Sequence, residues 1–520
     1  MAIKTRVYQD MVTLNTDDPT LIPLNHFADT QNSVRRDDGL WEKRKGMIQL
    51  GDDLGSGEAV HSLIGWRIAD GTRYITAGTD TDIYVYVEGV TYDVGTWTNA
   101  QSITSAEPWN SVQYRDILQF CNGVDDIRTT ADNSTFTQRA ESAGTVVRPK
   151  YMTQGNNFIT FAGDTSDPDI VYLSSGAPAV ADVYKYDSSN NQNIDIGNSY
   201  SVTGVLSLGD QIIVTKANQT YKTDLASLAT VPLDFSGGCE DHRGILRTQK
   251  NSILIPNRHG VYSIARTQIG DNAYFGNAES EVIRKLWRTI SDFTDIPGWF
   301  ITDENRAIWA ADSDEGRIAF VKMMDYATPV WTYYTGFNAS QFTTYKDSDD
   351  KDHYLFADNA VDQVWEFNQG WADGGAPINS VLALKNDDFD APGQLKSIEY
   401  ADIYGWISQF AEWNVELYKN DEAVPFDTLT ITSDNYLNPT SELDGLGSGA
   451  LGDTPLGGIE AEEGVEVKAF GFRIPILRDD IEKMQIVLYN TQGDVRVVFR
   501  AAIVYYDELP IDNYPQNQIA

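Results

Sequence analysis

The chain has 520 residues, of which 41% are hydrophobic and 11% aromatic, which is enough for one large domain and one or two smaller ones. Its formal net charge is −37, the opposite of what a general nucleic-acid-binding surface requires. No apolar run approaches the ~20 residues of a membrane helix, and Met1–Asp10 lacks the apolar core of a signal peptide, so we expect no membrane-spanning segment and no export by that route.

Residues 1–60 lack a strand repeat and are predicted to form an extended segment with one hairpin. Asp38-Gly39 is a strong hairpin-turn signal. Residues 1–50 hold seven basic and seven acidic side chains, and the basic ones include a dense cluster on both sides of this turn: Arg35, Arg36, Lys43, Arg44 and Lys45. Two interpretations stay open. The cluster is either the solvated face of a hairpin or a docking surface for an acidic partner subunit or DNA.

Short apolar runs separated by turn residues recur through residues 61–380. The clearest pair is Ile253–Ile255 and Val261–Ile264, on either side of a turn at Pro256–Gly260. Such runs are typical of paired antiparallel strands. Counterpart pairs begin at Ile75, Leu118, Ile159, Ile212, Ile308 and Tyr354, so successive starts lie 41 to 55 residues apart. This period matches the ~40–50 residues of a four-stranded blade and predicts a β-propeller of about seven blades.

Two longer intervals between repeats are explained by insertions. Glu279–Asp292 has apolar residues at helical spacing, acidic residues early and basic residues late, which predicts an amphipathic helix. This helix is expected to pack on the propeller or to fill its channel. Tyr186–Tyr200 is rich in Asn and Ser and is expected to be a surface loop.

Residues 381–520 change character and are predicted to form a separate antiparallel β-sandwich. Their strands are expected at Ser397–Trp406, Trp413–Tyr418, Val465–Ile476, Lys483–Tyr489 and Arg496–Tyr505. Leu443–Gly458 is too rich in glycine for the interior of a strand or helix and reads as a long loop. The chain is therefore divided at this stage into residues 1–60, 61–380 and 381–520.

The sequence predicts no catalytic residue set, no metal site and no cofactor. Its five histidines are scattered, and Cys121 and Cys239 are its only cysteines, which are most simply free buried thiols although pairing is open. Cys239 and His242 are close in sequence, but such neighbours seldom form a nucleophilic pair. Two acidic loops, Asp312–Gly316 and Asp347–Asp350, lack the spacing of a calcium loop and read as solvated turns.

Asn32–Gly46 begins with an Asn, contains a turn Gly and ends in Leu-Trp-Glu-Lys-Arg-Lys-Gly. This segment is similar to the N-terminal signature of the tail nozzle or packaged-DNA-stabilisation proteins of short-tailed bacteriophages, which has an Asn, a turn Gly and then Leu-x-Lys-Arg-x-Gly. Arg247–Ile264 resembles their central propeller segment, Glu279–Asp292 their inserted helix, and Gly449–Gly458 their C-terminal Gly-Pro loop. The match is weak over Tyr186–Tyr200.

The resemblance implies a non-enzymatic virion protein of the phage tail, assembled in the host cytoplasm. It implies a homo-oligomeric ring, with six-fold symmetry expected, attached below the portal and adaptor and in contact with other tail proteins. The ring extends the DNA channel, retains packaged DNA and passes it on ejection without binding it specifically. An acidic wall suits such a conduit, because DNA gains no counterion release from touching it.

A loop is the natural gate of such a channel, because it moves while sheets stay rigid. Leu443–Gly458 is the preferred candidate, with Leu446, Leu451 and Leu456 meeting their symmetry mates, and Tyr186–Tyr200 is the other. A clasp between neighbouring subunits is an equal alternative for the first loop. Two other functions remain open for the chain: a propeller glycan hydrolase, which needs paired carboxylates, and a protein-binding propeller scaffold.

Overall fold

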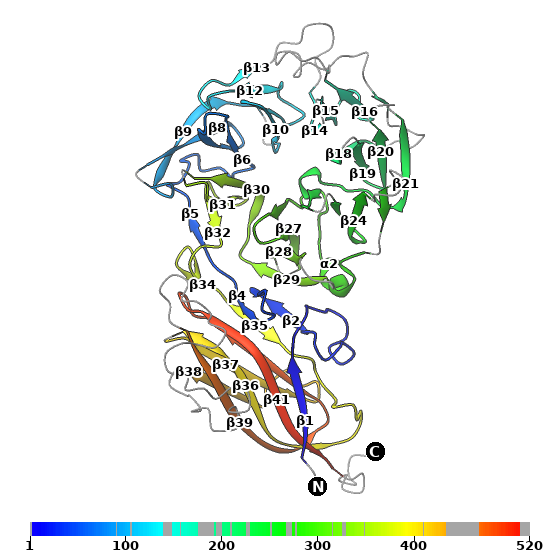
Figure 1. Cartoon of the computed structure of the whole chain (residues 1–520), viewed down its shortest axis with the longest axis vertical. Coiled ribbons are helices and arrows are strands. Elements are labelled where there is room, and N and C mark those ends of the chain that lie inside the picture. The colour runs from blue at the N-terminus through cyan, green and yellow to red at the C-terminus, as the bar shows by residue number, and fades with distance from the viewer. Residues whose placement is uncertain are drawn as a thin grey trace. The chain divides into compact units, whose positions relative to one another are not determined.

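Figure 1 presents a computed structural model in which nearly every regular element is a β-strand. Its helical segments, among the residues described, are η2 (His242–Gly244), η3 (Glu281–Ile283) and α2 (Arg284–Trp287). The all-β class predicted from the sequence is confirmed. The structure describes residues 3–89, 91–104, 107–138, 148–155, 158–174, 192–193, 200–208, 211–224, 229–249, 252–266, 273–275, 278–314, 316–324, 329–347, 349–408, 410–432 and 467–509.

The chain divides into two compact units. The first unit holds Met1–Gly46, Tyr326–Tyr334 and Gln369–Ala520, and the second holds Met47–Asp325 and Thr335–Asn368. Boundaries from the sequence lay at residues 60 and 380 instead. The difference arises because strands from the first 46 residues pair with strands from the end of the chain, as described below.

Five sheets of the second unit each contain four strands, paired antiparallel in chain order. They are β6 (Ser62–Arg67), β7 (Arg73–Gly78), β8 (Asp82–Glu88) and β9 (Gly95–Ser102); β10 (Asn110–Tyr114), β11 (Ile117–Cys121), β12 (Arg128–Thr130) and β13 (Thr137–Gln138); β14 (Tyr151–Gly155), β15 (Phe158–Ala162), β16 (Ile170–Leu173) and β17 (Gln192–Asn193); β18 (Val202–Leu208), β19 (Gln211–Lys216), β20 (Gln219–Asp224) and β21 (Thr230–Ser236); and β22 (Leu246–Arg247), β23 (Ser252–Asn257), β24 (Gly260–Arg266) and β25 (Ala273–Phe275).

Two further sets of consecutive strands follow in this unit. The first is β26 (Gly298–Ile301), β27 (Arg306–Ser313) and β28 (Gly316–Met323), and the second is β30 (Ala339–Lys346), β31 (Asp352–Asp358) and β32 (Val364–Phe367). The second set gains an early strand, β5 (Met47–Gln49), which pairs antiparallel with β32 so that Ile48 lies opposite Glu366. A strand from the start of the unit therefore completes the sheet at its end.

All seven hairpins expected from the repeats are confirmed. They are β7–β8, β11–β12, β15–β16, β19–β20, β23–β24, β27–β28 and β31–β32, the middle strands of their sheets. In β23–β24, Ile253 lies opposite Ile264, and the turn between them uses Gly260 at a φ of +139°. The sequence identified these pairs because the middle strands are the most continuously apolar.

Hydrophobic cores lie between consecutive sheets of the second unit. One core joins Trp66 of β6 to Trp109 and Phe120 of the next sheet, and another joins Val214 of β19 to Leu173 of β16. First strands of successive sheets also contact one another: β6 touches β10, β10 touches β14, β14 touches β18, β18 touches η2, β22 and η2 touch β26, β26 touches β30, and β30 touches β6. In Figure 1 these sheets surround a common centre.

The predicted helix over Glu279–Asp292 is much shorter than expected. Only Glu281–Trp287 is helical, as a 3-10 turn followed by four α-helical residues. The apolar periodicity identified the buried face in part: Ile283, Trp287 and Ile290 are buried, whereas Val282 and Leu286 are half-buried. Trp287 donates its Nε1 hydrogen to the carbonyl of Asn257 at 2.8 Å, so the segment packs on the end of β23.

Most of the described strands of the first unit fall into two hydrogen-bonded sets. One contains β3 (Ser33–Arg35), β4 (Trp41–Lys43), β41 (Val497–Glu508), β36 (Lys396–Ser408) and β39 (Val467–Ile481), with β1 (Lys4–Gln9) also paired to β41. The other contains β29 (Val330–Thr335), β2 (Asp29–Gln31), β35 (Ser380–Ala383), β40 (Met484–Asn490), β37 (Glu412–Lys419) and β38 (Asp427–Thr432). A short pair, β33 (Ala372–Asp373) and β34 (Ala376–Pro377), completes the unit.

Aromatic side chains fill the space between these two sheets. Phe27 contacts Trp41 and Phe499, with ring centroids 5.1 and 6.1 Å apart, and Trp413 of the other sheet lies 6.1 Å from Phe499. The expected hairpin at Asp38-Gly39 is confirmed as β3–β4. Among the described residues, no helix has the length and apolar character to cross a membrane.

Candidate functional site

Polar side chains on the first strands of the second unit connect each sheet to its neighbour. Gln341 and Thr343 of β30 accept hydrogen bonds from the backbone N–H groups of Leu63 and Gly65 of β6, at 3.3 and 2.9 Å. A Cβ atom at Gly65 would lie 2.4 Å from the carbonyl oxygen of Thr344. Glycine is therefore required where these two backbones approach.

The same pattern continues around the common centre. Ser62 accepts a hydrogen bond from the backbone N–H of Trp109 at 2.7 Å, and Asn110 accepts one from Met152 at 2.6 Å. Further links run from Ser207 N–H to Thr153 Oγ1, from Val205 N–H to His242 Nδ1, from Trp309 Nε1 to the Gly244 carbonyl, and from Trp299 Nε1 to Thr344 Oγ1. Each link satisfies a polar group that burial would otherwise penalise.

His242 is a structural member of this set. It is only 8% exposed, and because Nδ1 accepts from Val205, the ring proton resides on Nε2. Burial lowers its pKa to about 4, and the nearby Arg243 adds to the effect while Asp241 opposes it. The imidazole is consequently neutral at physiological pH.

An ion-pair network beside His242 holds three segments together. Arg243 donates to Asp241 and Asp295, both at 2.8 Å, and to the carbonyl of Ser340 at 2.9 Å. Arg317 donates to the other oxygen of Asp295 at 2.8 Å. Burial disfavours ionisation of Asp295, but the two guanidinium groups outweigh it and hold its pKa below the usual value. Both arginines are thus neutralised within the unit.

A cavity of about 420 Å³ lies among these first strands. Residues of β6, β10, β22, β26 and β30 line it, and its titratable lining residues are His242, Arg243 and Arg247. Of these, His242 is neutral and Arg243 is paired with Asp241 and Asp295.

The Cys239–His242 pair does not form a nucleophilic site. Cys239 donates its thiol hydrogen to the carbonyl of Asp241 at 3.0 Å, and burial raises the pKa of this thiol. The Nδ1 atom of His242 accepts a hydrogen bond from the backbone N–H of Val205 instead of contacting the thiol. Cys121 and Cys239 are both buried free thiols. The described residues contain no group of three or more His, Cys, Asp or Glu side chains arranged to hold a metal ion.

The carboxylates of Asp347 and Asp350, in the acidic loop Asp347–Asp350, have hydrogen-bond and ion-pair partners within the protein. Asp347 accepts backbone hydrogen bonds from Asp349 and Lys351 at 2.9 and 3.0 Å, and Asp350 pairs with Arg67 and Arg73 at 2.8 and 3.0 Å. Its carboxylates close a turn and form ion pairs, which agrees with the interpretation as a turn.

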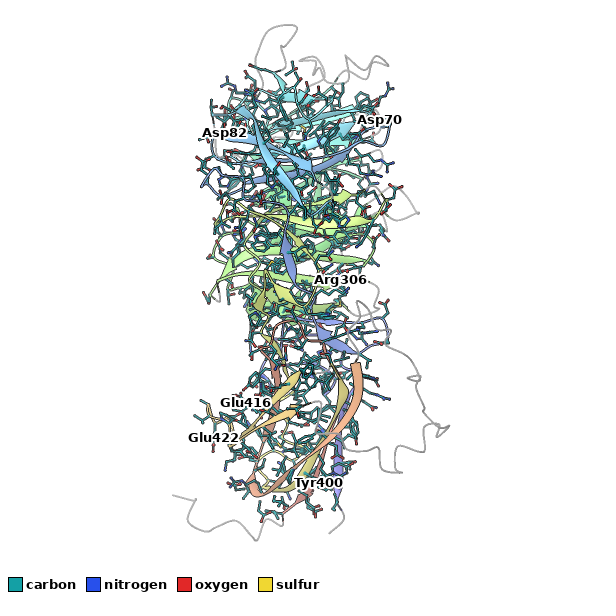
Figure 2. The ribbon with its side chains drawn as sticks, turned by 90° about the vertical axis from the view of Figure 1, so that its left-hand side faces the viewer. Asp70, Asp82, Arg306, Tyr400, Glu416 and Glu422 are labelled. Atoms are coloured by element: carbon teal, nitrogen blue, oxygen red, sulfur yellow. The ribbon has the colours of Figure 1, made fainter. Side chains whose placement is uncertain are left out.

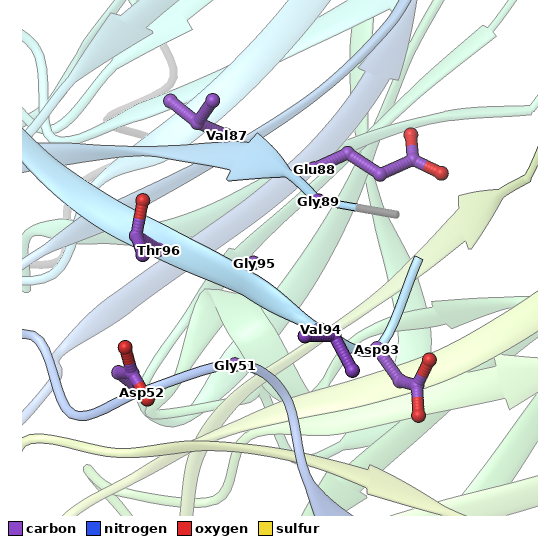
Figure 3. Close-up of a pocket in the computed structure, with 9 residues that line it drawn as sticks. All are labelled: Gly51, Asp52, Val87, Glu88, Gly89, Asp93, Val94, Gly95 and Thr96. Atoms are coloured by element: carbon purple, nitrogen blue, oxygen red, sulfur yellow. The ribbon is translucent and has the colours of Figure 1, made fainter. Parts of the chain in front are cut away.

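Figure 3 shows a second hollow of the unit, at the β8–β9 connection. Gly51, Gly89 and Gly95 leave it open, while the carboxylates of Glu88 and Asp93 lie at its edge. Here the glycines serve close backbone packing: a Cβ at Gly95 would lie 2.5 Å from the carbonyl oxygen of Val87.

The basic cluster of the first unit lies largely inside it, and this corrects the docking interpretation for two residues. Lys43 and Arg44 are 1% and 2% exposed. Lys43 donates to Asn490 Oδ1 at 3.2 Å and to the carbonyl of Gln492, and Arg44 forms an ion pair with Asp373. Neither reaches a partner while the unit is folded, because each is needed by a distant strand of the same unit.

The other three basic residues are partly exposed. Arg36 forms ion pairs with Asp38 and Glu42, at 3.3 and 3.2 Å, across the β3–β4 hairpin. Arg35 and Lys45 are likewise of intermediate burial. Of the five basic residues, Arg35, Arg36 and Lys45 are therefore the ones whose side chains are exposed enough to reach another molecule.

The gate candidates Leu446, Leu451 and Leu456 lie outside the described residues, as does most of Tyr186–Tyr200. Reasoning from the sequence missed the linking side chains of the first strands, such as Asn110, Thr153 and Gln341. A polar residue at the start of each repeat was the available signal, but such residues are indistinguishable from solvent-facing ones until the neighbouring strand is known.

Comparison with models of known protein families finds no match, and comparison with curated proteins likewise finds none.

Proposed function

We propose that the second unit is a closed seven-bladed β-propeller and that the protein is a ring-forming subunit of a phage tail nozzle. The propeller is supported by the seven repeated hairpins and by the closed series of contacts from β6 around to β30 and back. β5 supports it further, because a strand from the start of a propeller that completes its last blade joins the two ends of the ring. The first unit is proposed to be a β-sandwich of two sheets, which are antiparallel except for the parallel pair of β2 and β29.

The nozzle proposal rests on the structural role of Asn32–Gly46, the segment that resembles the N-terminal signature of that family. Asn32 donates to the carbonyl of Asn379 at 2.7 Å and accepts from Arg44 at 2.9 Å. Gly39 has a φ of +84°, as a turn glycine requires. A Cβ at Gly46 would lie 2.0 Å from the carbonyl oxygen of Ala372.

Together with the buried Lys43, these residues form one interlocking set. The signature residues therefore stabilise the first unit, because they connect residues 32–46 to residues more than 300 positions later in the chain. A family signature with this role is expected wherever the same unit recurs, and it supports membership of the nozzle family without any catalytic function.

Charge supports the proposed conduit. The second unit contains 23 basic and 43 acidic residues and the first contains 16 and 33, so both are strongly acidic. Figure 2 labels four of the acidic residues, Asp70 and Asp82 in the second unit and Glu416 and Glu422 in the first. A wall of this charge gives DNA no counterion release on contact. Such a ring would retain and release DNA by closing its opening rather than by binding the polymer.

The proposal is tested by the mass and shape of the purified protein. Native mass spectrometry and negative-stain microscopy, with and without portal and adaptor proteins of the same phage, are expected to reveal a closed ring that attaches to the adaptor. Antibodies should label the tail of intact particles. A chain that stays monomeric in the presence of these proteins and is absent from particles would contradict the proposal.

The loop Leu443–Gly458 remains the proposed gate. Deletion of Gly447–Gly452 should yield particles that assemble and package DNA but lose it on storage, measured as nuclease-sensitive DNA. Particles that retain their genome and infect normally would assign the loop another role.

A further inference from the structure

The outer face of the β1–β41–β36–β39 sheet is rich in aromatic side chains. Along β36, Ala401 and Ile403 point inward and are buried, while the alternate residues Tyr400, Tyr404 and Trp406 point outward and are partly exposed. Tyr505 of β41 lies opposite Tyr400 on the same face. Tyr400 is labelled in Figure 2. Isolated exposed aromatics need no explanation, but a row of them on one sheet does.

The rings at one end of this row are held in fixed positions. Tyr400 and Tyr505 have ring centroids 4.2 Å apart, and the Arg473 guanidinium lies 4.0 Å from the Tyr400 centroid. Arg473 in turn makes a two-pronged pair with the buried Asp402, at 2.7 and 2.8 Å. Side chains fixed in this way lose little entropy when a ligand covers them.

Tyr404 is the next aromatic residue on this face of β36. A Cβ at Gly471 would lie 3.0 Å from Tyr404 Cε1, so glycine leaves the ring room to lie on the neighbouring strand. Its hydroxyl is 3.5 Å from Asp402. Burial, with the nearby Asp402, raises the pKa of Tyr404 to about 12, which keeps the hydroxyl protonated.

At the Trp406 end the face becomes a hollow of about 370 Å³. It lies between the end of β1 and the β3–β4 turn, and its walls include Gln9, Asp10, Asp38 and Arg500. The Arg500 guanidinium is 5.9 Å from the Trp406 ring centroid. The hollow thus combines one aromatic ring with an amide, two carboxylates and a guanidinium in its lining.

We propose that this hollow and the aromatic row beside it bind an uncharged oligosaccharide. The C–H groups of a sugar ring suit the electron-rich face of Trp406. Each sugar hydroxyl both donates and accepts hydrogen bonds, which suits a wall that combines acceptor-only carboxylates with a donor-only guanidinium. Tyr404 is the next aromatic residue of β36 on this face and offers a further ring to a second sugar, whereas the Arg473 guanidinium already covers Tyr400.

Charge excludes the main competing ligands. The first unit has 17 more acidic than basic residues, which repels nucleic acids and anionic polysaccharides. A basic peptide is disfavoured because Arg500 and Arg473 already occupy positions beside Trp406 and Tyr400. This site belongs to the first unit alone and is independent of the proposed ring function.

The full-length protein is tested on an array of uncharged bacterial and plant oligosaccharides, with heparin fragments and a lysine-rich peptide as charged probes. The best oligosaccharide is then titrated by calorimetry and by tryptophan fluorescence. Trp406→Ala should weaken binding at least about tenfold, the loss of roughly one good aromatic contact. The matched control is Tyr418→Ala, which removes a partly exposed aromatic from β37 in the other sheet.

A second variant, Asp10→Asn, neutralises one carboxylate of the polar wall and should also weaken oligosaccharide binding while leaving the melting temperature unchanged. The proposal is overturned if no uncharged glycan binds, if Trp406→Ala and Tyr418→Ala bind equally well, or if the lysine-rich peptide competes with the sugar. It is also overturned if Trp406→Ala breaks a homo-oligomer that binds no glycan, since the face is then an interface between copies.

Discussion

Lys43 and His242 are buried bases, and burial lowers the pKa of each. Their neighbours explain why the protein keeps them. The cation of Lys43 bonds to an amide oxygen and a carbonyl of strands far along the chain, and His242 supplies an acceptor to the next sheet. Burial of each side chain costs desolvation free energy, and the hydrogen bond that it makes offsets part of this cost. Because burial also shifts the pKa of each group, each should make the free energy of unfolding depend on pH.

We expect the free energy of unfolding to fall as pH drops from about 6.5 to about 4, in part because of His242. In this range the unfolded state binds a proton at the usual pKa of 6.5 while the folded state, with a pKa of about 4, does not. The contribution is about 3 kcal/mol. Urea unfolding of the wild type and of His242→Gln checks it, since the variant should lose this part of the pH dependence. Parallel curves for the two proteins would contradict the expectation.

For Lys43, the pH range is higher. Burial, aided by Arg44, lowers the pKa of Lys43 from 10.5 to about 8, so between these values the unfolded state binds a proton that the folded state has lost. The wild type should therefore gain stability relative to Lys43→Met as pH rises from about 8, by at most about 1.4 kcal/mol per pH unit. Denaturant unfolding from pH 7 to pH 9.5 measures this. A constant difference between the two proteins would refute the burial of the charge.

The sequence located the basic cluster but not its surroundings. Charged residues are rarely buried without a partner, so exposure was the reasonable expectation for Lys43 and Arg44. Their partners Asn490 and Asp373 are 447 and 329 positions away, and no local pattern indicates that pairing. The turn at Asp38-Gly39 was predictable because it depends on adjacent residues alone.

At the scale of elements, local pairing was predictable and long-range pairing was not. The middle hairpins were found because apolar runs flank a short turn. Strands such as β2, β5 and β33 have two or three residues and no periodicity to detect. The length of the helix over Glu279–Asp292 was overestimated. Apolar residues at this spacing indicate only that one side of the segment is buried, and the turns that follow Trp287 bury that side as well as a helix would.

Ile48→Pro tests the closing strand. Proline removes a backbone donor from the β5–β32 ladder and should destabilise the second unit by about 1–3 kcal/mol, the cost of leaving a buried hydrogen-bonding group without its partner. Hydrogen exchange should speed up in residues 47–49 and 364–367 more than in β7–β8. Ile48→Thr, which keeps the backbone donor, is the control. Equal protection of 364–367 in the proline variant and the wild type would mean that β5 is dispensable.

At the scale of the whole molecule, the net charge of −37 governs how copies meet. Like-charged subunits repel, and salt screens this repulsion over about 10 Å at 0.1 M. We therefore expect the proposed ring to be more stable at 300 mM than at 20 mM sodium chloride, measured by sedimentation velocity. Glycerol of equal osmolality serves as the control. A ring that dissociates with added salt would point to attractive ion pairs between subunits.

In both units, residues that are synthesised early pair with residues that are synthesised late, so the order of synthesis limits when each sheet can form. β5 cannot pair until β32 has been synthesised, and β1, at residues 4–9, cannot pair until residues 501–506 of β41 have been synthesised. At ~5–20 residues per second, about 25–100 seconds separate the emergence of β1 from that of its partner. During that interval β1 lacks its partner strand, and we expect chaperones or the negative charge of the chain to keep it apart from neighbouring nascent chains on the same messenger RNA.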